Sequence, residues 1–131
     1  MEKIPIAGIA KENAGNEAMK PYIAPVMTGL GDLQKATGWL MQNGLANPDN
    51  AGAAATDFME LFGLVAFAYM WARMAKVAND KIAASGPTPY LKTKLVTGKF
   101  FMERMLPETS AHLARLQSGS ATTMELAAEA F

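Results

Sequence analysis

The sequence predicts an all-α protein: an up-down helical bundle of three long helices plus a short C-terminal helix. Apolar residues recur at alternating spacings of three and four in three long stretches, and no strand-like alternation of useful length appears. Proline and glycine punctuate the stretches, as expected at helix ends. The length of 131 residues favours one domain. We expect residues 1–19 to be a linker or lead-in and residues 20–131 to form the helical bundle domain.

The first long helix is expected to begin near Pro21 or Pro25, because proline is tolerated in a first turn. Asn43 and Gly44 provide a C-terminal stop. The residues between them that share one apolar stripe are Ile23, Val26, Leu30, Leu33, Thr37 and Leu40.

The second long helix is expected to start at Pro48, with Asn47 as its cap, and to end near Ser85. No charged residue occurs between Glu60 and Arg73. The polar residues before this run and those after it lie on nearly opposite sides of the helix, roughly half a turn apart around its axis. The run therefore has no side meant for water, and a small bundle covers only part of a central helix.

Four aromatic residues in or beside this run are candidate interface anchors: Phe62, Phe67, Tyr69 and Trp71. Aromatic side chains dominate the cores of protein interfaces, although at helical spacing they are more often core residues. These four point in different directions, so only some of them can serve. We expect the chain to form a homo-oligomer, most simply a two-fold dimer.

The third long helix is expected to begin at Thr88, to be kinked or restarted by Pro107, and to stop at Gly119. Thr122 and Glu125 have the spacing of a capping box for a short last helix. The expected inner stripe of the third helix consists of Leu91, Leu95, Gly98, Met102, Met105, Thr109, His112 and Leu116.

The sequence contains no set of residues that predicts catalysis, cofactor binding or metal binding. His112 is the only histidine, and the nearest acidic residue in sequence is Glu108, so we expect a structural role. Asp57 and Glu60 lie three residues apart on one helix face, but the Glu-x-x-His motif of di-iron bundles is absent. These two acids are expected to form ion pairs across the bundle or with basic groups of a neighbour.

Composition argues against several partners and fits a reducing compartment. Twelve basic and twelve acidic residues cancel, which argues against nucleic-acid binding. The uncharged run of the second helix is shorter than the roughly 20 residues that a membrane span needs. The first residues do not form a signal peptide, and cysteine is absent, so a cytoplasmic location is expected.

Five segments carry a recognisable pattern: Gly31–Gln34, Thr37–Leu40, Asp57–Gly63, Lys94–Pro107 and Ser118–Phe131. They resemble the extra C-terminal helical domain of bacterial acyl-CoA dehydrogenases, and in particular the 3-methylmercaptopropionyl-CoA dehydrogenase type. The resemblance implies a parent enzyme that uses FAD to oxidise an acyl-CoA to a 2-enoyl-CoA. In that family a glutamate base and the flavin-binding domains precede the extra domain, and no residue of this chain matches the glutamate.

The resemblance therefore implies an accessory domain that is inactive alone and packs on the upstream catalytic domains or on the second subunit. Two alternatives remain open. The chain could be an independent small bundle that binds a hydrophobic ligand or a partner helix. Peripheral membrane association ranks last, because no strongly basic amphipathic helix is present.

Overall fold

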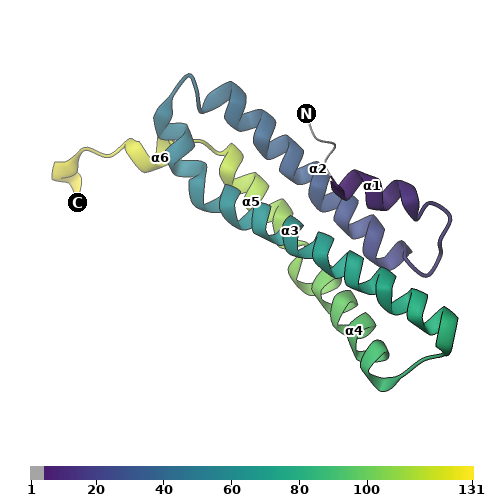
Figure 1. The fold of residues 1–131 in the computed structure, drawn as a ribbon. Helices are drawn as coiled ribbons and strands as arrows, with labels where there is room; N and C mark the ends of the chain where they lie inside the picture. The colour runs from purple at the N-terminus through teal and green to yellow at the C-terminus, as the bar shows by residue number, and fades with distance from the viewer. Residues whose placement is uncertain (1–4) are drawn as a thin grey trace.

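The computed structural model describes residues 5–131, which are helical without any strand (Figure 1). The all-α prediction is confirmed. α2 (Lys20–Asn43) and α3 (Pro48–Ser85) lie side by side and run in opposite directions, and α5 (Glu108–Gln117) packs against both. α4 (Pro89–Phe100) lies against the C-terminal half of α3.

The boundaries of the long helices follow their caps. Pro21 occupies the first turn of α2, as expected. The side chain of Asn47 accepts a hydrogen bond of 3.1 Å from the backbone N–H of Asp49 and so caps α3. Thr88 caps α4 in the same way, by accepting from the N–H of Leu91 at 3.2 Å.

α2, α3 and α5 approach closely because small residues lie between them. A Cβ on Gly29 of α2 would lie 3.3 Å from Leu106 Cδ1 and 3.4 Å from Val65 Cγ2. α3 contributes its inner face, which we define as its buried apolar residues: Ala54, Leu61, Val65, Ala68, Ala72, Ala75 and Ala78. Five of these seven residues are alanines. The core is therefore filled by the close approach of the helices and not by bulky side chains of α3.

The third expected helix is divided by a wide turn. After α4 the chain forms a π-helical turn (Phe101–Met105), in which the N–H of Leu106 donates to the carbonyl of Phe101 at 2.9 Å. Pro107 follows this turn, and α5 then begins, as the proline predicted. A π turn carries one residue more than an α turn. Leu106 is therefore buried, whereas Met105, which was expected on the inner stripe, is 45% exposed.

Part of the segment expected to be a linker or lead-in is helical. α1 (Pro5–Glu12) packs on α2, and Ile9 and Met19 are buried in the core. Residues 1–4 of that segment lie outside the described residues.

The short last helix is present as α6 (Ala121–Met124), followed by a 3₁₀ turn, but its start differs from the prediction. Thr122 lies inside α6, and no side-chain hydrogen bond caps the helix, so the expected capping box is not formed. The helix start is tied to the bundle instead, because Asn50 Oδ1 accepts hydrogen bonds from the backbone N–H and the hydroxyl of Ser120 at 3.0 and 2.9 Å. Tertiary contacts with α3 thus replace the local cap.

Candidate functional site

The side of α3 opposite its inner face carries large apolar residues that the described elements leave at least 37% exposed. We define the outer face as the exposed apolar residues on this side: Met59, Phe62, Ala66, Phe67, Met70, Met74 and Val77. Apart from the adjacent Ala66 and Phe67, they recur every three or four residues, so they form one continuous stripe along the helix.

On α3 the small apolar side chains face the core and the large ones face outward, which is the reverse of the usual distribution. Large apolar residues normally fill a core, and small ones are tolerated at the surface. Here alanines pack inward, whereas Phe62 and Phe67 remain 55% and 63% exposed. A contiguous exposed apolar stripe of this kind usually marks an interaction surface. The outer face of α3 is therefore the candidate functional site.

The structure divides the four aromatic candidates into two pairs. Phe62 and Phe67 lie on the outer face. Tyr69 and Trp71 are half-buried and pack against the core cluster around α2 and the π turn. Each also has a cation over its ring, with the Arg73 guanidinium 5.8 Å from the centre of Tyr69 and the Lys94 ammonium 5.9 Å from Trp71.

Sequence reasoning concentrated on aromatic residues and did not assign the methionines of the outer face. Met59, Met70 and Met74 were recognisable by their helical spacing with Phe62 and by the high methionine content. Methionine is flexible and polarizable, and it adapts to the shape of a partner surface.

By length and composition, α3 could also cross a membrane. An 18-residue window of this helix has a mean hydropathy of 1.4, and 22% of that window is buried. The sequence argument for a shorter run counted uncharged residues only, whereas this window admits a few charged ones. The core helices of soluble proteins meet the same criterion of length and composition.

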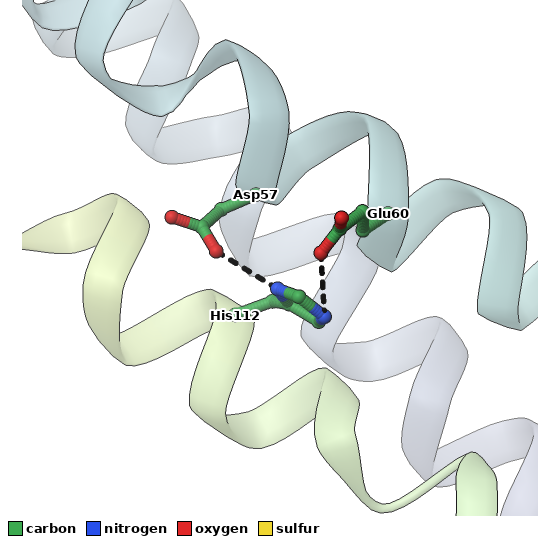
Figure 2. A group of neighbouring side chains, drawn as sticks. All are labelled: Asp57, Glu60 and His112. Carbon is green, nitrogen blue, oxygen red and sulfur yellow. Dashed lines mark hydrogen bonds and ion pairs between the residues drawn. The ribbon is translucent and has the colours of Figure 1, made fainter.

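A charged cluster joins the N-terminal half of α3 to α5 (Figure 2). His112 of α5 is 4% exposed, and its ring lies between two carboxylates of α3. Its Nδ1 is 2.8 Å from Asp57 Oδ1, and its Nε2 is 3.3 Å from Glu60 Oε2. The ring is thereby held at both nitrogens.

Arg115, one turn after His112, completes the cluster. Its Nε donates to Asp57 Oδ1 at 3.0 Å, and its Nη2 lies 2.9 Å from His112 Nδ1. Nδ1 donates to Asp57 when it carries a proton and accepts from Arg115 when it does not. Burial acts to raise the pKa of Asp57, but the hydrogen bonds and positive charges of His112 and Arg115 outweigh it and hold this pKa below its usual value.

This cluster confirms one sequence expectation and corrects another. Asp57 and Glu60 do form ion pairs across the bundle. His112 was expected to have only Glu108 nearby, but Glu108 is the most distant of its three acidic neighbours, at 4.0 Å. The closer partners lie more than 50 residues away in sequence, which is why no local pattern revealed them.

Asp57, Glu60 and His112 also offer ligand atoms within 4.8 Å of one another, as a metal site would. The two carboxylates face opposite nitrogens of the ring, however, and a single ion binds only one ring nitrogen. Arg115 places a further positive charge beside Asp57. The arrangement therefore suits an ion-pair link between α3 and α5 better than a metal centre, and no serine, threonine or cysteine is paired with His112 among the hydrogen bonds of the described residues.

These features define a class: an all-helical domain with an internal ion-pair link and a large uncovered apolar face on its longest helix. A model of the family described as acetyl-CoA dehydrogenase C-terminal like matches residues 5–127. The chain belongs to this family. A comparison with curated proteins gives no match.

Proposed function

We propose that this chain is an accessory and assembly domain of an FAD-dependent acyl-CoA dehydrogenase, and that it is not catalytic alone. The parent enzyme would oxidise an acyl-CoA to a 2-enoyl-CoA, and the 3-methylmercaptopropionyl-CoA dehydrogenase type is the subgroup that the sequence segments favour. The domain would bind the catalytic domains or the second subunit of that enzyme.

The observation that carries this proposal is the outer face of α3. An apolar stripe that runs from Met59 to Val77 would favour association, because covering it removes apolar area from water at about 25 cal/mol per Å². Lost translational and rotational freedom offsets part of this gain. Family membership supports the choice of partner. Without the partner, the same face would pair with a second copy of the chain, most simply in a two-fold dimer.

Sedimentation velocity of the purified chain at micromolar concentration tests the role of this face. We expect a dimer, and we expect the double variant Phe62→Asp/Phe67→Asp to weaken dimerisation by at least about tenfold, because it places two charges in an apolar interface. The double variant Leu45→Asp/Val96→Asp is the matched control, since these residues are also exposed but lie outside the outer face. A wild-type chain that stays monomeric, or an equal effect of both double variants, would contradict the proposal.

A binding assay with a flavin-containing acyl-CoA dehydrogenase that lacks its C-terminal domain tests the choice of partner. The wild-type chain should bind this enzyme, and the Phe62→Asp/Phe67→Asp variant should not. The purified chain alone should be colourless and should not reduce an electron acceptor with any acyl-CoA. A yellow chain that turns over acyl-CoA would overturn the accessory role.

A further inference from the structure

A cavity lies between the C-terminal part of α3 and the start of α4. At this end of the molecule the two helices diverge toward their connecting loop (Figure 1). Its volume is about 510 Å³, within the range of small-molecule sites. Met70, Met74, Val77, Tyr90 and Leu91 supply an apolar lining. Tyr90 is 68% exposed, so a large aromatic side chain stands at the mouth with little protein cover.

Three cations and no acidic residue line the same cavity. Arg73 and Lys81 come from α3, and Lys94 comes from α4. Within residues 6–131, no carboxylate lies within ion-pair distance of these three groups. Asp80, the nearest acid on α3, is engaged by Lys76 at 2.6 Å.

Two of the three cations, Lys94 and Arg73, lie over aromatic rings, and of these rings only Tyr90 lines the cavity itself. The ammonium of Lys94 lies 5.5 Å from the centre of Tyr90 and 5.9 Å from that of Trp71, and the guanidinium of Arg73 lies over Tyr69. Such contacts orient a cation without neutralising its charge. The cavity therefore combines an apolar wall with a positive rim that no described carboxylate balances.

We propose that this cavity binds a small amphipathic anion, in which an apolar body carries one carboxylate, sulfonate or phosphate group. The apolar body packs against Met74, Val77 and Leu91, and the anionic group is bound by Lys94, Lys81 and Arg73. An apolar ligand without charge would leave the rim unused, and a cationic amphiphile would be repelled by three like charges. The inference goes beyond the assembly role of the outer face, with which the cavity shares Met70, Met74 and Val77.

Titration calorimetry with three probes that share one alkyl chain tests the proposal: decanoate, decanol and decyltrimethylammonium, each below the concentration at which it forms micelles. We expect decanoate to bind at least about tenfold more tightly than decanol, and the ammonium compound not to bind. The affinity for decanoate should fall as salt rises, because part of it is electrostatic. Equal affinities for the three head groups would overturn the proposal.

Substitutions locate the site. Lys81→Gln and Lys94→Gln should each weaken decanoate binding by about two- to fivefold, the size of an ion pair that solvent partly screens. Lys92→Gln and Lys99→Gln are the controls, because these lysines lie on α4, as Lys94 does, but do not line the cavity. Lys81 is exposed, so its substitution should not impair folding even if that of the half-buried Lys94 does. Equal weakening by the control variants would contradict the site.

Two further measurements distinguish binding of a small anion in the cavity from association through the outer face and from binding to a lipid surface. The Phe62→Asp/Phe67→Asp variant should bind decanoate as the wild type does, because neither residue lines the cavity. Loss of dimerisation with decanoate binding intact would thus separate the two proposals. Sedimentation with phosphatidylglycerol vesicles tests a lipid surface, and binding to vesicles without binding to monomeric decanoate would overturn the proposal of a small soluble ligand.

Discussion

The two faces of α3 are apolar to a similar extent, but they have opposite relations to the rest of the molecule. The inner face is mainly alanine and is covered by α2 and α5, whereas the outer face carries phenylalanine and methionine and is left largely exposed by the described elements. The difference teaches that hydrophobicity does not by itself decide which side of a helix enters the core. Side-chain size does so here, because small residues allow the close approach that the bundle requires.

The largest expected effect on stability comes from truncating one side chain on each face of α3 to alanine. Leu61→Ala should lower the free energy of unfolding by about 2–5 kcal/mol, because Leu61 is fully buried and its loss leaves a cavity. Phe62→Ala, one residue further along, should change the stability of the monomer by less than about 0.5 kcal/mol. Urea denaturation of both variants measures the contrast. A comparable loss in the two variants, measured below the concentration of dimerisation, would mean that the outer face is covered within the monomer.

The second prediction tests whether side-chain size determines which face of α3 packs inward. Ala68→Leu should destabilise the protein by about 1–3 kcal/mol, because the inner face has no room for the added atoms. Ala66→Leu is the control on the outer face and should be close to neutral, since Ala66 is exposed and leucine is a good helix former. Thermal unfolding of both variants provides the measurement, and a neutral Ala68→Leu would contradict close packing at this position.

The charged cluster gives a smaller effect. His112→Gln should lower stability by about 1 kcal/mol, because it removes the hydrogen bond to Asp57 while Arg115 still pairs with that carboxylate. Dimerisation through the outer face should be unchanged, since His112 lies on the opposite side of α3. Loss of dimerisation without loss of stability would assign His112 a role beyond the link between helices.

The same cluster predicts a pH dependence. The pKa of Asp57 is lower in the folded state than in the unfolded chain, so its stabilising contribution is complete above the unfolded value of about 4. The contribution is lost as the pH falls through the folded value. Asp57→Asn should therefore reduce the slope of stability against pH below about pH 4, and urea denaturation between about pH 2 and pH 6 measures it. An unchanged slope would contradict the lowered pKa.

The smallest effect is expected at the surface. Lys76 and Asp80 form an exposed i,i+4 pair on α3, and such pairs are worth about 0.3–0.5 kcal/mol. Asp80→Asn should therefore change stability less than any inner-face variant, as judged by the midpoint of urea denaturation. A loss above about 1 kcal/mol would show that this pair is more than a surface contact.

Local signals made most of the fold predictable. Pro21, Asn47, Thr88 and Pro107 marked helix boundaries that the structure confirms, because caps and prolines act over a few residues. The inner position of Leu106 in place of Met105 was not predictable from a period of 3.6, since the π turn changes the spacing there, whereas Thr109, His112 and Leu116 lie on the buried side as expected.

The candidate site was predictable only in part. The uncharged run of α3 indicated that apolar area would lack cover, and Phe62 and Phe67 are indeed exposed. The sequence could not tell which side would face outward, because both sides are apolar and the choice depends on contacts with α2 and α5. The partnership of His112 with Asp57 depends on the same long-range packing.

The π turn before Pro107 determines how far α5 is rotated about its axis relative to α4. If this turn tightened to an α turn, α5 would rotate by about 100° relative to α4, the angle of one residue. Met105 would then replace Leu106 in the core, and His112 would swing away from Asp57. A proline at this position disfavours tightening, because its ring clashes with the carbonyl four residues earlier. Pro107 therefore fixes the angular relation between the cavity beside α4 and the ion-pair link of α5, although it belongs to neither.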